Sequence, residues 1–294
     1  MLDRLETYIA QLQADPVNFL ITMAYTWGVI LFSLILHECA HGYMALKCGD
    51  PTAKMLGRLS LNPARHLDPI GTLCMFVFGF GWAKPVPVNP RNFRSYRRDD
   101  FLVSVAGVTV NLIIFVSAVL LSCILNRIMM GKETLDALLT AYDVGVEPFV
   151  SPMYNVGGYL MDGNWDKLAE FYPYAYGLDA EKGVYLLEGW DALKQVLDVP
   201  WLLWVQRALL LLAQVNLTLA IFNLLPIPPL DGFHVVNDLL MKGRLQLSYQ
   251  LHQVTRLVLM VLLLTGFLNK ILSVSVSFLY ETVLRMFLML TGQA

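Results

Sequence analysis

Charged residues are scarce in this chain. Asp, Glu, Lys and Arg together make up 15% of its 294 residues, whereas soluble domains contain about 25%. Hydrophobic residues make up 56% of the sequence. So little charge excludes an ordinary soluble domain, and the composition predicts an integral protein that crosses a lipid bilayer several times.

Cysteine pairs and basic clusters are also missing. The four cysteines, Cys39, Cys48, Cys74 and Cys123, form no CxxC pair, and we interpret them as small apolar residues rather than disulfide partners or metal ligands. The formal net charge is −2 and no basic cluster stands out, so no nucleic-acid partner is expected. The first eighteen residues are polar and contain acids, so we expect no cleavable signal peptide.

Long apolar stretches predict about five transmembrane helices, with four or six as alternatives. They cover residues 16–47, 101–125, 201–225, 249–268 and 271–290. As helices that rise about 1.5 Å per residue, they are long enough to cross a hydrocarbon layer about 30 Å thick. Apolar residues recur at helical spacing near the start of the chain, so this part is expected to be a helix on the membrane surface. The predicted fold class is an all-α polytopic membrane protein.

We divide the chain into five parts on this basis. They are an interfacial segment (1–15), a membrane core with the first two spans (16–125), an extracytoplasmic insertion (126–199), a third core helix with a proline-rich motif (200–245) and C-terminal membrane helices (246–294). No internal repeat is evident.

The distribution of Lys and Arg predicts the orientation. Residues 47–100 contain nine Lys or Arg against four Asp or Glu, whereas residues 126–199 contain five against twelve. Because loops rich in Lys and Arg stay on the cytoplasmic side, the first connection is expected there and the second outside. The first span then ends at the cytoplasmic face of what we expect to be the cell (inner) membrane.

An unusual element lies between the first two spans. Residues 70–83 are apolar, but fourteen residues are too few to cross the bilayer. They are followed by Lys84-Pro85-Val86-Pro87-Val88-Asn89-Pro90, whose prolines favour an extended backbone. We predict a re-entrant or edge-strand element over 70–90 that dips toward the functional site, because such backbone requires protein or a water-filled cavity around it.

The run His37-Glu38-Cys39-Ala40-His41 follows a stretch from Pro16 to Leu36 without any charged residue. Ionised groups in such a helix are usually functional, because inserting one at mid-bilayer costs about 2.5–3.5 kcal/mol. Positions i and i+4 share one helix face. Two imidazoles there can hold one zinc ion, which leaves Glu38 free to activate water.

Catalytic zinc requires a third protein ligand and keeps its fourth position for water. The best candidate lies in the segment Asn223-Leu224-Leu225-Pro226-Ile227-Pro228-Pro229-Leu230-Asp231-Gly232. Its prolines must end the third span, and Asp231 behind the break can turn inward as a ligand or cap the following helix. Asn223 either lies near the site or satisfies carbonyls that the prolines leave unpaired. His66 and Asp68 could form a second metal pair, although we favour a role in tying down their loop.

These motifs resemble those of the site-2 protease family of intramembrane zinc metalloproteases. The resemblance rests on HExxH in a membrane helix and on NxxPxPxxDG at 223–232. Residues 57–72, residues 84–90, and Ala106-Gly107 with Asn111 are also similar, although Val108 replaces the proline that usually follows the glycine. The similarity covers about 17–125 and 200–245, and no segment resembles the PDZ or CBS domains of some relatives.

The resemblance implies a set of roles. One zinc ion would be held by His37, His41 and Asp231, and Glu38 would act as general base and then as proton donor. Asn223 would hydrogen-bond the tetrahedral intermediate or orient the substrate.

Two further roles come from the residues themselves. Substrate would be held extended by strand addition along Pro85, Val86, Pro87 and Val88. Gly107 and Asn111 would allow close helix packing with one interhelical hydrogen bond.

The predicted function is an intramembrane zinc metalloendopeptidase acting in regulated proteolysis, with its site toward the cytoplasm. Its partners would be the lipid bilayer and a transmembrane protein substrate, which must unwind locally because helical carbonyls are already bonded. The alternatives are a membrane zinc transporter or an inactive scaffold with the same metal ligands. An intact Glu38 argues against a scaffold, and transport does not need a general base.

Overall fold

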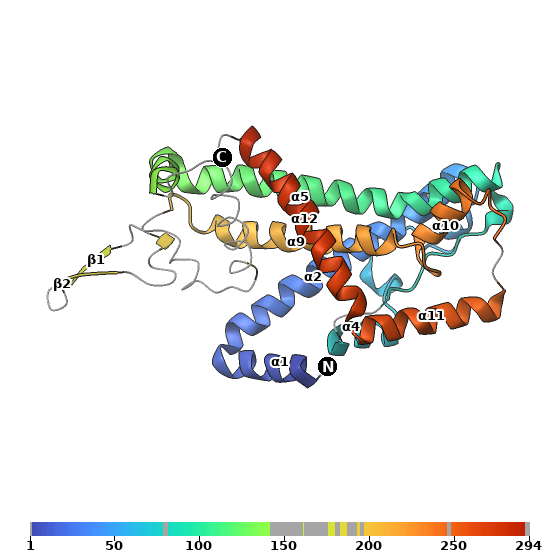
Figure 1. Ribbon diagram of the computed structural model, residues 1–294, viewed down its shortest axis with the longest axis horizontal. Coiled ribbons are helices and arrows are strands. Elements are labelled where there is room, and N and C mark those ends of the chain that lie inside the picture. Colours follow the sequence, from blue (N-terminus) through green and yellow to red (C-terminus); the bar gives the residue numbers. More distant parts are fainter. Residues whose placement is uncertain are drawn as a thin grey trace. The chain divides into compact units, whose positions relative to one another are not determined.

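The computed structural model describes residues 2–78, 82–141, 161, 176–179, 183–186, 193–194, 197–245 and 248–291 (Figure 1). In chain order, the elements are α1 (Leu2–Ala14), α2 (Pro16–Cys48), α3 (Thr52–Met55), a 3-10 turn (Pro63–Arg65), α4 (Pro69–Phe78), a second 3-10 turn (Pro90–Asn92), α5 (Tyr96–Ala141), β1 (Tyr176–Asp179), β2 (Gly183–Leu186), α9 (Leu202–Asn223), α10 (Asp231–Leu239), α11 (Tyr249–Leu264) and α12 (Phe267–Leu290). Helices thus form nearly all of the regular structure described.

Four helical stretches are long and apolar enough to cross a membrane. They are Pro16–Cys48, Tyr96–Met129, Leu202–Asn223 and Lys270–Leu290. The predicted class, a polytopic helical membrane protein, is therefore confirmed, with four candidate spans among the described residues instead of the five we favoured.

The missing fifth span is α11, which is helical but has only 16 residues. At about 1.5 Å per residue such a helix covers about 24 Å, less than the hydrocarbon layer. It ends before Gly266, which has a φ of 73°. A glycine in this left-handed region is a common helix terminator, and it interrupts the apolar run that we had predicted as one span over 249–268.

The predicted insertion at 126–199 is helical at its start, because α5 continues to Ala141. Within it, β1 and β2 pair as an antiparallel hairpin, from Tyr176 opposite Leu186 to Asp179 opposite Gly183. The remaining residues of this segment lie largely outside the described part of the chain. The boundaries of the five predicted parts stay a prediction.

The chain divides into two compact units. The first comprises Met1–Pro16, Trp27–Ile114 and Val215–Ser277, and the second comprises Val17–Thr26, Phe115–Gln214 and Phe278–Ala294. The first unit contains the HExxH run, the proline-rich connection and the NxxPxPxxDG motif. All of the predicted site residues therefore belong to one unit.

The second unit contains a buried arginine, Arg207, whose residue is 0% exposed. Its Nη2 donates to Thr22 Oγ1 at 2.5 Å and its Nε donates to the Met161 carbonyl at 3.1 Å. The guanidinium also lies over the rings of Tyr25 and Trp204. Such partners are required because a cation in a membrane helix is costly unless protein groups replace water around it.

In the first unit, the element predicted over 70–90 has two parts. Residues 69–78 form helix α4, and the chain is extended without assigned strand pairing from 82 to 89. The start of α4 is capped, since Asp68 Oδ1 accepts a hydrogen bond from the Gly71 N–H at 2.8 Å. A Cβ at Gly71 would collide with the Trp82 carbonyl, so the glycine lets the returning chain approach the helix. The extended backbone predicted for 84–90 is thus found over 82–89, and the apolar residues before it form a short helix.

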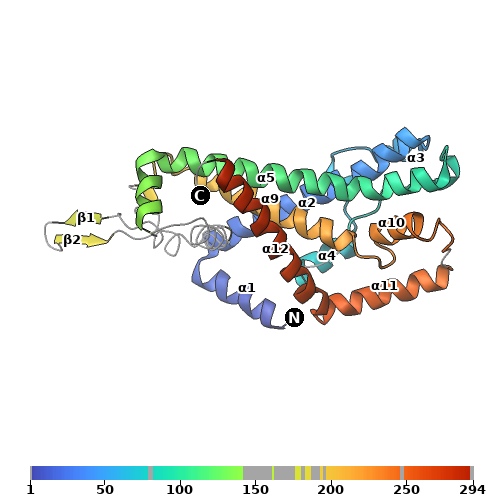
Figure 2. The same cartoon turned by 45° about the horizontal axis from the view of Figure 1, so that its top comes forward.

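The break after α9 lies where the prolines predicted it. Helix α9 ends at Asn223, and α10 begins at Asp231; Figure 2 shows the intervening loop between the two helices. A Cβ at Gly232 would collide with the carbonyl oxygen of Leu224, so only glycine permits this close turn. Leu230 is buried with Leu259, Leu268 and Leu272, and this apolar cluster anchors the start of α10.

Candidate metal centre

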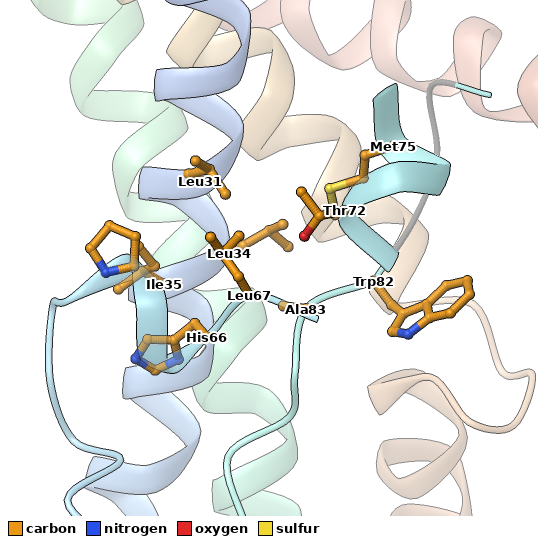
Figure 3. A pocket seen from close by; sticks show the side chains of 10 residues that line it. Leu31, Leu34, Ile35, His66, Leu67, Thr72, Met75, Trp82 and Ala83 are labelled. Atoms are coloured by element: carbon orange, nitrogen blue, oxygen red, sulfur yellow. The ribbon is translucent and has the colours of Figure 1, made fainter. Parts of the chain in front are cut away.

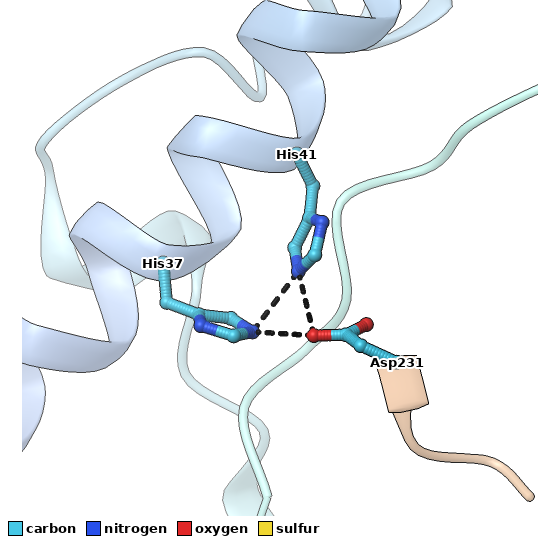
Figure 4. A group of neighbouring side chains, drawn as sticks. All are labelled: His37, His41 and Asp231. Carbon is cyan, nitrogen blue, oxygen red and sulfur yellow. Dashed lines mark hydrogen bonds and ion pairs between the residues drawn. The ribbon is translucent and has the colours of Figure 1, made fainter. Parts of the chain in front are cut away.

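Three side chains from two distant motifs converge in the first unit (Figure 4). His37 Nε2 lies 3.3 Å and His41 Nε2 lies 3.4 Å from Asp231 Oδ2, and the two Nε2 atoms are 3.0 Å apart. The histidines lie one turn apart on α2, and Asp231 is the first residue of α10. In a tetrahedral zinc site with bonds of about 2.0–2.1 Å, ligand atoms are about 3.3 Å apart. The spacing therefore fits a divalent cation.

Hydrogen bonds at the far side of each imidazole orient the rings. His41 Nδ1 lies 2.7 Å from the Val103 carbonyl oxygen, which can only accept, so Nδ1 carries the proton and donates it. Asn111 Nδ2 lies 3.2 Å from His37 Nδ1, while the buried Asn111 Oδ1 has no hydrogen-bond partner among the described residues. The two ends of an amide exchange on a half turn, and the exchanged orientation lets Oδ1 accept a hydrogen bond from the His37 Nδ1–H. Both Nε2 lone pairs then point at Asp231, as metal ligation requires.

The Asp231 carboxylate oxygen that meets the two imidazoles needs a positively charged partner. Asp231 Oδ2 is buried and has no hydrogen-bond donor among the described residues, and it faces two nitrogen lone pairs. An ionised carboxylate with two imidazole nitrogens is a donor set that suits zinc.

Helix α5 closes one side of this group through a glycine. A Cβ at Gly107 would collide with His41 Nε2 and with His37 Cε1. Gly107 therefore allows the α5 backbone to lie directly against both imidazoles. The predicted close packing at this position occurs, and it brings α5 against the candidate metal ligands themselves.

Asn111 is fully buried beside His37, so an Asn111→Ala substitution should weaken zinc binding or cleavage by about 10- to 100-fold, the usual effect of losing such an outer partner. Asn111→Asp keeps an oxygen acceptor for the Nδ1–H and should lose less. Zinc retention against a graded chelator, with cleavage measured in parallel, checks this. Zinc retention and cleavage that both equal the wild-type values in Asn111→Ala would contradict the orienting role.

Glu38 contacts the extended segment. Its Oε2 accepts a hydrogen bond from the backbone N–H of Val86 at 2.7 Å, and Val86 is 7% exposed. The segment that we predicted as a substrate-binding strand thus lies against the predicted general base. This contact could not be predicted from residue types, because every residue except proline has the same backbone donor.

A buried carboxylate that the sequence analysis did not single out holds the end of this segment. Asp50, 0% exposed, accepts hydrogen bonds from Asn89 N–H and Asn92 Nδ2, both at 2.7 Å, and from Thr52 N–H at 3.1 Å. Burial favours a raised pKa for Asp50, but these donors outweigh it and lower the pKa. Asp50 follows α2 directly, so it ties the extended segment to the helix that carries the histidines.

Other predicted site residues lie elsewhere. Asn223 Nδ2 donates to the Leu219 carbonyl at 3.0 Å within α9, so both of its predicted roles stay predictions. His66 Nε2 lies 2.7 Å from the Ser60 carbonyl, and Asp68 caps α4. Both therefore tie down their loop, and the group of His37, His41 and Asp231 is the single cluster of metal-binding side chains found in the described part of the chain.

A small apolar hollow lies beside α2, lined by Leu34, Ile35, His66, Leu67 and Trp82 among others (Figure 3). Its volume is about 10 Å³, which is close to the space that one water molecule needs. As it stands, the hollow is too small for the side chain of a substrate.

A second network holds the other end of α10. His234 Nδ1 lies 3.2 Å from Asp100 Oδ2, and Arg97 Nε donates to the Asp238 carbonyl at 2.6 Å. Arg97 thereby satisfies one of the carbonyls that a helix C-terminus leaves unpaired. Both contacts fix α10 to the start of α5, and so help to place Asp231 at the opposite end of α10.

The Asp238 side chain in this network predicts an unusual pH dependence. Burial and the nearby Asp100 carboxylate raise the pKa of Asp238 to about 6. The native state then binds more protons than the unfolded state between about pH 4 and pH 6, so stability falls as the pH rises. Asp238→Asn, which stays neutral, should raise the melting temperature at pH 8 and change it little at pH 4.5.

Thermal unfolding in detergent at the two pH values measures this effect. Asp198→Asn is a matched control, because Asp198 is exposed. The prediction is wrong if Asp238→Asn destabilises the protein more at pH 8 than at pH 4.5.

Comparisons with known proteins agree with this geometry. A profile described as "Peptidase family M50" matches residues 25–266. A Bacillus subtilis (strain 168) protein named "Putative zinc metalloprotease YwhC" is 34% identical over 221 residues, which are 75% of this chain and 71% of that protein. No solved structure shows a significant match. The matched range includes His37, His41 and Asp231.

Proposed function

The chain belongs to peptidase family M50, the site-2 protease family of metalloproteases, and we propose from this premise that it is an intramembrane zinc endopeptidase. The observation that carries the proposal is the convergence of His37 and His41 from an apolar helix with Asp231 from a second motif. The protein is a multi-pass membrane protein, and the proposed substrates are transmembrane segments of other membrane proteins.

The proposed reaction assigns a role to each side chain at the centre. His37, His41 and Asp231 would hold one zinc ion, which supplies a Lewis acid that polarises a peptide carbonyl and makes water more acidic. Glu38 would accept a proton from the attacking water and return it to the leaving amine. No nucleophilic serine or cysteine is then required.

The proposed substrate must be unwound to reach these groups, because the carbonyls of an intact helix are already hydrogen-bonded. The extended residues 82–89 support strand addition beside Glu38. Pro85 and Pro87 have no N–H, and the Val86 N–H is used by Glu38, so a substrate strand paired with residues 85–87 would mainly donate hydrogen bonds to their carbonyls. Arg58 Nη2 already donates to the carbonyls of Lys84 and Pro85.

We also propose a location and a role for the activity. The excess of Lys and Arg in residues 47–100 supports a site near the cytoplasmic face of the cell (inner) membrane. Cleavage of a transmembrane segment there would release a membrane-held protein to the cytoplasm, which is regulated intramembrane proteolysis.

Chelation and metal replacement test the proposal. Purified protein in detergent is incubated with a model transmembrane substrate, before and after treatment with a chelator and after zinc is restored, and the products are identified by mass spectrometry. Internal cleavage that is lost on chelation and regained with zinc supports a zinc endopeptidase. Cleavage that continues after metal analysis has shown the protein to be free of zinc would refute the proposal.

The same preparation separates the rival functions. Reconstituted in liposomes, a zinc transporter would move zinc across the bilayer, and an inactive scaffold would bind zinc without cleaving. Zinc flux without proteolysis would replace the proposed function with transport. The intervening Glu38, placed beside the metal-binding group, favours the protease.

A further inference from the structure

We propose that Val86 is a positioning residue for Glu38. Its backbone N–H holds one oxygen of the Glu38 carboxylate, and its side chain, seated on Gly42, keeps that N–H in place. This inference rests on the proposed function, because it concerns the side chain proposed as general base. It makes the extended segment part of the machinery that orients this base, in addition to any contact with substrate.

The first observation is the hydrogen bond itself. Val86 N–H donates to Glu38 Oε2 at 2.7 Å, which leaves Oε1 for other partners. A glutamate side chain on a helix has several rotatable bonds, and ordering it costs conformational entropy. A hydrogen bond from a fixed backbone donor to a charged group is among the stronger ones, so it holds the carboxylate in one orientation before substrate arrives.

The second observation is the packing one helical turn further along α2. A Cβ added at Gly42 would lie 2.8 Å from Val86 Cγ1 and 2.6 Å from Leu59 Cδ2. These distances are shorter than ordinary contacts between carbon atoms. Residues 38 and 42 share one helix face, so the Val86 side chain rests on Gly42 while its N–H meets Glu38.

The third observation is that the segment is held independently of Glu38. Lys84 N–H donates to the His66 carbonyl at 2.7 Å, and Asn89 N–H donates to Asp50 Oδ2 at 2.7 Å. These bonds fix the segment on both sides of Val86. The donor is therefore preorganised, and Glu38 adapts to it rather than the reverse.

The flanking prolines leave Val86 as the backbone donor in this part of the segment. Pro85 and Pro87 restrict the backbone to extended conformations and have no N–H. Val86 is thus the only residue from 85 to 87 with a backbone donor, and this donor is used by Glu38. A residue that served only to pair with a substrate strand would be expected to direct its N–H away from the enzyme.

The test uses the full-length protein and a model transmembrane substrate, with kcat, KM and bound zinc measured for each variant. Val86→Pro removes the N–H and should lower kcat by about 10- to 100-fold, the effect of losing a hydrogen bond to a charged group. KM and zinc content should stay close to the wild-type values. A raised KM with unchanged kcat would overturn the inference and make Val86 a substrate contact.

A second series of variants tests the same positioning role through the packing of Val86 on Gly42, without introducing a proline. Gly42→Ala should lower kcat because its methyl group displaces Val86. The double variant Gly42→Ala/Val86→Ala, which removes the Val86 Cγ1 that the new methyl group would meet, should recover kcat, whereas Gly42→Ala/Leu59→Ala should not. Gly28→Ala is the matched control, because a Cβ at Gly28 meets nothing within 4 Å.

The outcomes separate this inference from the function on which it rests. If the wild type does not cleave the substrate, or does not regain activity when zinc is restored after chelation, the proposed function fails. If the wild type cleaves, but Val86→Pro matches its kcat or the Val86 double variant recovers no better than the Leu59 one, only the positioning role is overturned. If Val86→Pro loses zinc, the Gly42 series decides.

Discussion

A Glu38→Gln variant is expected to lose at least about a thousandfold in cleavage rate while it still binds zinc. Gln has nearly the same shape, and its carbonyl oxygen can accept the hydrogen bond that Val86 N–H now gives to Glu38. It cannot accept a proton from water at neutral pH. General acid–base groups contribute about 10²–10⁴-fold to rates, and here one side chain would serve in both proton transfers.

Single-turnover cleavage of a transmembrane substrate measures this loss, and metal analysis of the same sample shows whether zinc is retained. Glu281→Gln is a matched control, because Glu281 pairs with Arg285 on α12 and has no proposed role in the reaction. Cleavage by Glu38→Gln within tenfold of the wild-type rate would remove Glu38 from the chemistry.

The second large effect concerns the metal itself. Asp231→Ala should leave the purified protein with little bound zinc and no measurable cleavage. Asp231 is the one member of the converging group that α2 does not supply, and two imidazoles alone fall short of the three protein ligands of a catalytic zinc site. The substitution also leaves the two Nε2 atoms, 3.0 Å apart, without the carboxylate that would complete the set of ligands.

Zinc per protein, measured after gel filtration without added metal, checks this prediction. Asp198→Ala serves as the control, since Asp198 is an exposed aspartate and should keep its zinc. Full zinc content in Asp231→Ala would show that another group completes the site, and would require a different assignment of the ligands.

The two histidines of the HExxH run share one face of α2. The i,i+4 spacing of His37 and His41 is a local property of a helix, so it could be predicted without knowledge of any other part of the chain. The proline break before Asp231 was equally local, because proline lacks the donor that a helix needs. The span count differed from the five predicted, since α11 ends before Gly266 within an apolar run and is too short to span.

Other parts of the site gave no signal in the sequence. The Val103 carbonyl that orients His41 and the Val86 N–H that holds Glu38 are backbone groups, which every valine in the chain possesses. Asp50 looks like an ordinary polar residue after a helix, and only its buried position reveals the four hydrogen bonds that it accepts.

The amino-acid sequence alone determined that this is a helical membrane protein with a zinc-binding pattern, because apolar runs and helical spacing are properties of neighbouring residues. The tertiary structure decided that Asp231 meets the two histidines, that Gly107 and Gly42 admit close approach, and that a backbone amide orients Glu38. Such contacts depend on how distant segments pack, and packing is set by the shapes of all the elements together rather than by any one stretch of sequence.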